Sequence, residues 1–216
     1  MNRRTSNYIL IGLICCAVVV CIYLSVRGGS KNIQLGVYQA LGAVTAEETA
    51  KLIPKNAKVL VIVRDAGPGE NPAIEAQLDA FRKTLKKHRG PTMTVATFDA
   101  SPALMMYTGG AISETKILEL LEQYKDVNAL VLFCPLPPLS DPGVALLKNR
   151  KLTIVVVASF RPDYAALIKD GVIRMVVAPR EIQFPSETPE DQPRSLRALF
   201  DRQFVIIDES SLGNRR

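Results

Sequence analysis

The stretch KVLVIV (residues 58–63) decides the fold class, because it predicts a β-strand that is buried on both faces. It is short, continuously apolar and dominated by β-branched residues. A helix is expected shortly after it, since Asn71 is a good N-cap residue and Pro72 suits the first helical turn. The apolar side chains of this helix recur at spacings of three and four residues; they are Ile74, Leu78, Phe81 and Leu85.

Strands and helices alternate along the following hundred or so residues. Further buried strands are predicted at residues 93–98, 129–133, 152–158 and 172–177, with helices between them. Apolar strands that alternate with helices are typical of a parallel sheet with helices on both faces. The sequence therefore predicts an α/β fold, a three-layer α/β/α sandwich with a mainly parallel five-stranded sheet of the Rossmann-like or flavodoxin-like kind, with strand order 2-1-3-4-5. Residues 204–207 are a candidate for an added edge strand.

An uncharged apolar run lies close to the N-terminus, at residues 8–26. As a helix it would be about 28 Å long, which approaches the roughly 30 Å of a bilayer's hydrocarbon core. We interpret it as one N-terminal transmembrane helix, a signal-anchor. A cleaved signal peptide is the alternative, but the run is longer than the usual ~7–15 residues and Leu24-Ser25-Val26 is a poor cleavage site.

Charge distribution bears on topology and on partners. The bases near the helix ends give a slight preference for a cytoplasmic N-terminus, which places the soluble domain in a periplasm or outside the cell, with the chain in the cell membrane as a single-pass protein. Much of the net charge of +6 belongs to these flanking bases. The rest of the chain lacks the dense basic face of a nucleic-acid-binding protein, so we expect no nucleic acid partner.

The predicted organisation has five parts. Residues 1–7 are an N-terminal tail, 8–26 the transmembrane helix, and 27–54 a juxtamembrane linker. Within the linker, Thr45 and Glu48 form a capping-box pattern that predicts a short helix at residues 46–53. Residues 55–180 form the α/β domain, and 181–216 form a Pro-rich, acidic extension with a C-terminal tail that we expect to be disordered from residue 210.

Candidate ligand-binding residues follow from the predicted topology, because ligands of open parallel sheets bind beyond the carboxyl ends of the strands. The candidates at these ends are Asp65, Asn71, Asp99 and Arg161. The alternative is that they are only the polar residues that any strand-end loop carries.

Catalytic and metal-binding motifs are not found. His88 ends a predicted helix among lysines, and Cys134 follows a strand with no base nearby in the sequence. The loop at residues 65–71 lacks the spacing of a phosphate-binding loop. We therefore expect no enzyme activity, no metal and no cofactor.

The order of several segments resembles a known family. Residues 59–63 lead to Asn71-Pro72; residues 116–124 lead into 127–132 and then Pro135; residues 146–151 lead into 152–157. In this order, over residues 58–177, the chain resembles the N-terminal lobe of type I periplasmic sugar-binding proteins and the related ligand domain of LacI-type repressors. The resemblance implies a lobe that binds a small polar ligand.

The chain also departs from that family. Asn128 and Ala129 stand where the family has Asp-Gly, and Ser159 stands where it has an acidic residue. A second lobe is not expected in a chain that ends at Arg216.

The function predicted from these observations is a membrane-anchored, non-catalytic binding or sensing module. The alternative is a structural accessory subunit of a membrane protein complex, which the apolar residues 33–44 favour. The expected partners are the lipid bilayer through residues 8–26, a membrane protein and a small polar ligand.

Overall fold

The computed structural model describes residues 31–65, 71–88, 90–99, 108–160, 163–180 and 195–213. Within these ranges, no helix is both long enough and apolar enough to cross a bilayer. The transmembrane helix expected at residues 8–26 lies outside the described residues, as does most of the Pro-rich segment after residue 180.

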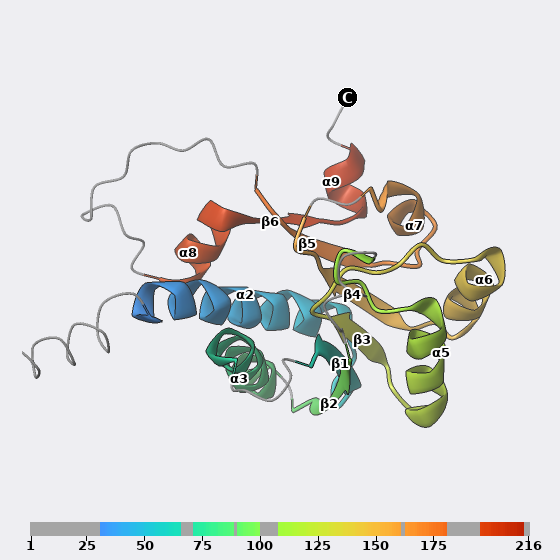
Figure 1. Cartoon of the computed structure of the whole chain (residues 1–216), viewed down its shortest axis with the longest axis horizontal. Helices are drawn as coiled ribbons and strands as arrows, with labels where there is room; N and C mark the ends of the chain where they lie inside the picture. Colours follow the sequence, from blue (N-terminus) through green and yellow to red (C-terminus); the bar gives the residue numbers. More distant parts are fainter. Residues whose placement is uncertain are drawn as a thin grey trace, which may run out of the picture.

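A mixed sheet of six strands forms the centre of the molecule, in the order β2-β1-β3-β4-β5-β6 (Figure 1). The strands are β1 (Lys58–Arg64), β2 (Thr92–Phe98), β3 (Ala129–Leu132), β4 (Thr153–Val157), β5 (Met175–Pro179) and β6 (Phe204–Ile207). The first five pair in parallel, and the predicted order 2-1-3-4-5 is confirmed. The sheet has one strand more than the five predicted; it is the edge strand for which residues 204–207 were the candidate, and it pairs with β5 in the antiparallel direction.

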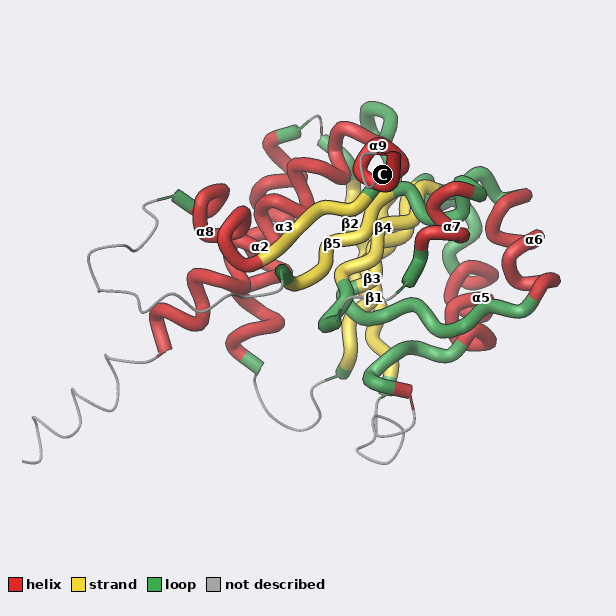
Figure 2. Tube along the Cα trace, turned by 90° about the horizontal axis from the view of Figure 1, so that it is seen from above, coloured by secondary structure: helices red, strands yellow, loops and turns green. Residues whose placement is uncertain are grey.

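Helices cover both faces of the sheet, as predicted (Figure 2). On one side lie α2 (Lys31–Leu52), α3 (Pro72–Lys87) and α8 (Leu196–Gln203). On the other side lie α5 (Glu114–Gln123), α6 (Asp141–Asn149) and α7 (Ala165–Lys169), while α9 (Glu209–Gly213) follows β6. This is the α/β/α sandwich that the alternating sequence pattern predicts.

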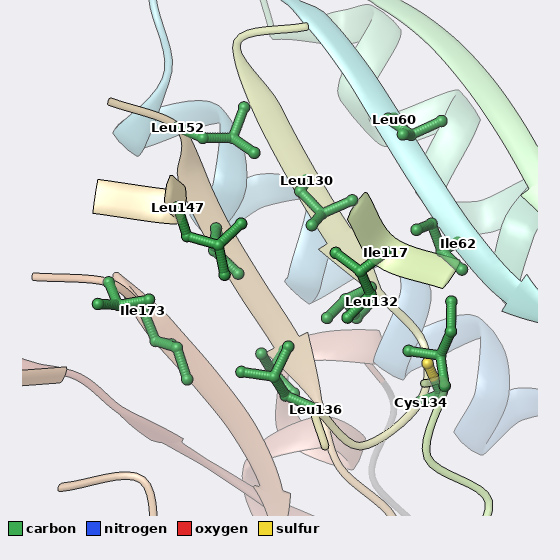
Figure 3. Packing of buried hydrophobic residues seen from close by; sticks show 14 of the residues in the cluster. Leu60, Ile62, Ile117, Leu130, Leu132, Cys134, Leu136, Leu147, Leu152 and Ile173 are labelled. Atoms are coloured by element: carbon green, nitrogen blue, oxygen red, sulfur yellow. The ribbon is translucent and has the colours of Figure 1, made fainter. Parts of the chain in front are cut away.

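Each central strand contributes side chains to two separate hydrophobic cores, one on each face of the sheet, because successive side chains point to opposite faces. In β1, Val59, Val61 and Val63 belong to the core under α2 and α3. Leu60 and Ile62 belong to the core under α5 and α6, where Figure 3 shows them beside the strand that carries Leu130 and Leu132. Burial on both faces explains why the strand is apolar throughout.

The segment before β1 differs most from expectation. The prediction of a linker with a short helix at residues 46–53 is wrong in its described part, which is one 22-residue helix, α2. Thr45 lies inside this helix and is fully buried, so it is not a cap. The helix packs so closely on α3 that a Cβ added at Gly42 would stand 2.0 Å from the carbonyl oxygen of Gln77. α2 is thus stabilised by close packing of small side chains against other elements. Such packing leaves little amphipathic pattern in the sequence, so the full length of the helix was not predicted.

The C-terminal part of the chain also belongs to the sandwich. The sequence predicts an extension and tail after residue 180, with a candidate edge strand at residues 204–207. In the structure α8 and that edge strand, β6, pack on the sheet and its helices. Phe200 is buried on the α2 side, and its ring contacts that of Phe204 at 5.4 Å between centroids. The prediction of a disordered tail from residue 210 is wrong for residues 210–213, since α9 continues to Gly213.

Candidate functional site

The carboxyl edge of the parallel strands brings two of the predicted site residues together. Arg64 pairs with Phe98 in the register of β1 and β2, and the N–H of Asp65 donates to the carbonyl oxygen of Phe98 at 2.9 Å. Asp65 and Asp99 therefore leave adjacent strands at the same level. Both residues are exposed. Both residues thus lie at the edge where open α/β sheets bind ligands.

The other two candidates have different positions. Asn71 is half-buried and caps α3, because its side-chain oxygen accepts hydrogen bonds from the N–H groups of Ala73 and Ile74 at 3.2 and 3.3 Å. That oxygen already has a structural role. Arg161 lies outside the described residues. The assignment of all four residues to ligand binding stays a prediction.

A glycine turn lies at the same edge, where the sequence analysis did not place a site residue. Gly109 and Gly110 have φ values of +60° and +82°, which favour glycine. A Cβ added at Gly110 would stand 3.4 Å from a guanidinium nitrogen of Arg64, and one added at Gly109 would stand 3.7 Å from the ring of Phe160. The turn thus lies against residues that follow or end β1 and β4. The Gly-Gly dipeptide was the available sequence signal.

Phe160 is the most exposed of the large apolar residues at this edge, with 49% of its surface accessible. It follows β4 and lies beside the glycine turn. An exposed aromatic ring at the edge of the sheet that also carries two carboxylates and a guanidinium suits a polar ligand with an apolar face. Carboxylates accept hydrogen bonds from hydroxyls, the guanidinium donates them, and the ring packs on the apolar face.

Two ionisable groups below this edge are kept neutral. Cys134 is only 3% exposed, and burial raises the pKa of its thiol to about 12, against smaller opposing effects of the Ile112 backbone and the Arg64 charge. Figure 3 shows Cys134 in the cluster with Ile62 and Leu136.

Burial also raises the pKa of Tyr164 to about 12, and its hydroxyl donates to the carbonyl oxygen of Leu136 at 2.8 Å. Both groups are structural, and the thiol is not an activated nucleophile.

A groove of about 490 Å³ lies between α5 and α6. It is lined by Glu114, Thr115, Leu118, Glu119, Glu122 and Leu146. Its carboxylates are engaged in the pairs Glu114–Ser140, Glu119–Lys116 and Glu122–Arg150. Hydrogen bonds from the side chain and the N–H of Ser140 hold the pKa of Glu114 below its ordinary value. Glu119 and Glu122 thus have cationic partners, whereas Glu114 is paired with a neutral serine. Among the described residues, no group of three or more His, Cys, Asp or Glu could hold a metal ion.

Similar proteins are found by comparing structures and not by comparing sequences. No protein-family model matches the sequence, and no similar protein is found among curated ones. A sugar ABC transport substrate-binding protein from Bordetella parapertussis 12822 matches with a TM-score of 0.53 and 17% identity, over 82% of this chain and 57% of that chain. A solute-binding protein from Agrobacterium vitis with bound D-fucose matches with a TM-score of 0.52 and 12% identity, over 82% and 60%.

AraP, an arabinose-binding protein from Geobacillus stearothermophilus, matches with a TM-score of 0.50 and 20% identity, over 83% of this chain and 63% of that chain. The chain thus spans less than two thirds of the length of these structures. It has the fold of a single lobe of a periplasmic sugar-binding protein, and the resemblance predicted from residues 58–177 is confirmed for the fold.

Proposed function

We propose that this chain is a membrane-anchored, non-catalytic module that binds a small polar ligand of the sugar class at the carboxyl edge of its sheet. The main support is the shared fold. Structures with the same lobe carry D-fucose or are named as arabinose-binding proteins. The ligand edge of such a sheet is where this chain gathers Asp65, Asp99 and Phe160.

The residue types support this ligand class. Asp65 and Asp99 directly follow two adjacent strands, and carboxylate oxygens are acceptors that suit the hydroxyl groups of a sugar. Phe160 supplies a ring for the apolar face of a pyranose or furanose. Arg161 follows Phe160 in the sequence and stays a candidate hydrogen-bond donor.

The proposal of a binding rather than catalytic role rests on the positions of the two reactive residue types. His88 ends α3 and precedes β2, so it lies at the amino edge of the sheet. Cys134 follows β3 at the carboxyl edge and is a buried, neutral thiol. A Cys–His pair needs hydrogen-bond contact, which opposite ends of a sheet exclude.

Sugar titrations of the full chain in detergent micelles test the ligand. We expect binding of a monosaccharide, with D-fucose and arabinose as first probes, by isothermal titration calorimetry. Asp65→Asn, Asp99→Asn and Phe160→Ala should each weaken binding by about tenfold or more, which corresponds to ~1.4 kcal/mol. Asp126→Asn is the matched control, because Asp126 is exposed before β3 at the opposite edge. Unchanged affinity in all three site variants, or no heat with any monosaccharide, contradicts the proposal.

Membrane attachment through residues 8–26 is the second part of the proposal. It is supported by the length and the uncharged character of that run. The full chain should stay with membranes after alkaline carbonate washing, and a chain starting at residue 31 should not. Protease protection in intact cells tests whether the domain lies in the periplasm or outside the cell. Extraction of the full chain by carbonate contradicts the anchor.

The accessory-subunit alternative has less support than the sequence suggested. Residues 33–44 favoured it because they are apolar without an obvious partner. In the structure, Ala40, Leu41 and Val44 are buried in the domain's own core. Co-purification of a stoichiometric membrane protein with the full chain, without any sugar binding, would favour this alternative.

A further inference from the structure

The outer edge of β2 carries unpaired backbone groups. Within the described residues, β2 pairs only with β1. The N–H of Thr92 donates inward to the carbonyl of Ala57 at 3.0 Å, and the carbonyl of Phe98 accepts inward from Asp65. Since backbone groups of successive strand residues alternate in direction, the even-numbered residues face β1. The residues whose N–H and C=O groups face outward are Met93, Val95 and Thr97.

Within the part of the chain that the structure describes, this edge shows none of the features that usually protect an edge strand. The seven residues TMTVATF contain no charge and no proline. Their register with β1 is continuous from Lys58–Thr92 to Arg64–Phe98, so the strand has no bulge. Thr94 and Thr97 are exposed on opposite faces. A long, uncharged, regular edge strand is a template for pairing with another chain.

The helix above this edge has a polarised surface. α2 packs on α3 at Gln77 and Phe81, through the close approach of Gly42. By helical periodicity, the flank of α3 turned away from α2, toward the β2 edge, carries exposed charges. They are acidic in the first half of α3 and basic in the second half: Glu75 and Asp79, then Arg82 and Lys86.

We propose that the β2 edge and this flank of α3 form a two-fold interface with a second copy of the chain. Antiparallel pairing centred on Val95 places Met93 opposite Thr97 of the second copy, so every outward backbone group finds a partner. The same rotation reverses one α3 against the other. Glu75 then lies opposite Lys86 of the second copy, and Asp79 lies opposite Arg82. Asp79 already pairs with Arg82 and Lys83 of its own helix at 3.3 and 3.4 Å, so the Glu75–Lys86 pairs carry the charge argument.

Charge complementarity selects the second copy as the occupant. Only the antiparallel arrangement sets the acidic half of α3 against the basic half, whereas a parallel one sets like charges together. A two-fold contact pairs the same strand edge of both copies, so neither β2 edge remains open to a third chain and the assembly stops at a dimer rather than growing into a fibre. The interface joins two sheets into one continuous sheet, and it is separate from the carboxyl edge at which ligand binding is proposed.

The first test uses the full chain in detergent micelles at micromolar concentration. Analytical ultracentrifugation, corrected for bound detergent, should give the mass of two chains. Thr97→Pro removes an outward N–H and puts a ring into the edge, so it should give a monomer. Thr97→Val keeps the N–H and should remain dimeric. A monomeric wild-type chain, or a dimeric Thr97→Pro variant with the native circular dichroism spectrum, overturns the proposal.

A charge exchange tests the same interface where Thr97→Pro disturbs folding. Glu75→Lys and Lys86→Glu should each raise the dimer dissociation constant at least tenfold, since each places like charges across the two-fold axis twice. The double variant exchanges the pair and should restore the dissociation constant to within about threefold of wild type. Both side chains are exposed, so neither change removes core packing. Single variants that dimerise like wild type, or a double variant with the additive loss, overturn the proposal.

Discussion

Thr45 and Thr49 lie one turn apart in α2, and both are fully buried. Their hydroxyl groups differ. The hydroxyl of Thr49 donates to the carbonyl oxygen of Thr45 at 2.7 Å. The hydroxyl of Thr45 finds no hydrogen-bond partner in the described part of the chain. A buried polar group without a partner costs about 1–3 kcal/mol, so the two threonines should respond in opposite ways to loss of the hydroxyl.

We predict that Thr45→Val raises the free energy of unfolding by about 1 kcal/mol, because valine has the same shape and removes the unsatisfied oxygen. Thr49→Val is the matched control and should lower it by about 1 kcal/mol through loss of a made hydrogen bond. Urea titrations followed by circular dichroism measure both values. Equal effects of the two substitutions would show that the Thr45 hydroxyl has a partner in solution.

A second prediction at this scale concerns Cys134. Its buried thiol should not react with a disulfide reagent at pH 8 in the folded protein, and should react at once in urea. The measurement needs a background in which Cys15, Cys16 and Cys21 are replaced by alanine. Ser159→Cys, at the exposed end of the neighbouring strand, is the positive control. Rapid labelling of folded Cys134 would contradict the burial.

The same thiol has a stability consequence at high pH. Its folded pKa of about 12 lies above the ordinary value of 9.0, so the folded state holds the proton more tightly than the unfolded state. The contribution to stability is complete below pH 9 and is lost as the pH rises toward 12. The Cys134→Ala variant should lack the part of the decrease in folding stability that this thiol causes between pH 9 and pH 12, which urea titrations at these pH values measure.

At the scale of elements, α8 is joined to α2 by charges far apart in the chain. The guanidinium of Arg197 lies 2.7 Å from the carboxylate of Glu48, which also pairs with Lys51 at 2.8 Å. Partial burial of Glu48 opposes its ionisation, but the hydrogen bonds from Lys51 and Arg197 outweigh that effect and hold the pKa of Glu48 below its ordinary value. The pair therefore stabilises the contact between the two helices.

The lowered pKa sets the pH dependence of this contact. A carboxyl group whose folded pKa is depressed contributes stability above its unfolded value, here 4.5, and loses it as the pH falls through the folded pKa. We predict that Glu48→Gln lowers the free energy of unfolding by about 1 kcal/mol at pH 7 and reduces its decline in acid. Urea titrations at pH 7 and pH 3 measure this. Glu119→Gln, at an exposed pair on α5, should change neither value measurably.

The same scale shows which elements a sequence predicts. The strand at residues 58–63 and the cap at Asn71 were predictable, because strand burial and helix capping leave local patterns. α2 was not, since Gly42, Ala46 and Ala50 pack against neighbours that are distant in the sequence. At the candidate site, Asp65 and Asp99 follow from topology alone. Phe160 follows β4 and reaches this edge by the same topology, but an apolar residue was not counted among the polar candidates. Gly110 meets Arg64 only through the tertiary fold, and the Gly-Gly dipeptide was its only local signal.

At the scale of the whole molecule, α2 completes one of the two cores. Its Leu41 and Val44, and Ile53 directly after it, are buried in the core between the sheet and the neighbouring helices. Each such side chain contributes about 1.5–3 kcal/mol on burial, and its loss would also expose Phe81 and Phe200. Five such losses together amount to about 7.5–15 kcal/mol, which is comparable with the roughly 5–15 kcal/mol that is typical of a domain's net stability. The sandwich should not survive without this helix.

We therefore predict that a chain starting at residue 31 folds and that one starting at residue 55 does not, although the sequence pattern alone places the domain boundary at 55. The longer chain should unfold cooperatively in urea with a native near-ultraviolet circular dichroism spectrum. The shorter chain should lack that spectrum and aggregate, because the face that α2 covers would be open to solvent. A peptide of residues 31–54, added in excess, should recover part of the native spectrum by rebinding that face. The opposite result is cooperative unfolding of the shorter chain without the peptide, with a free energy of unfolding that falls as steeply with urea concentration as that of the longer chain. That result would contradict the assignment of α2 to the core.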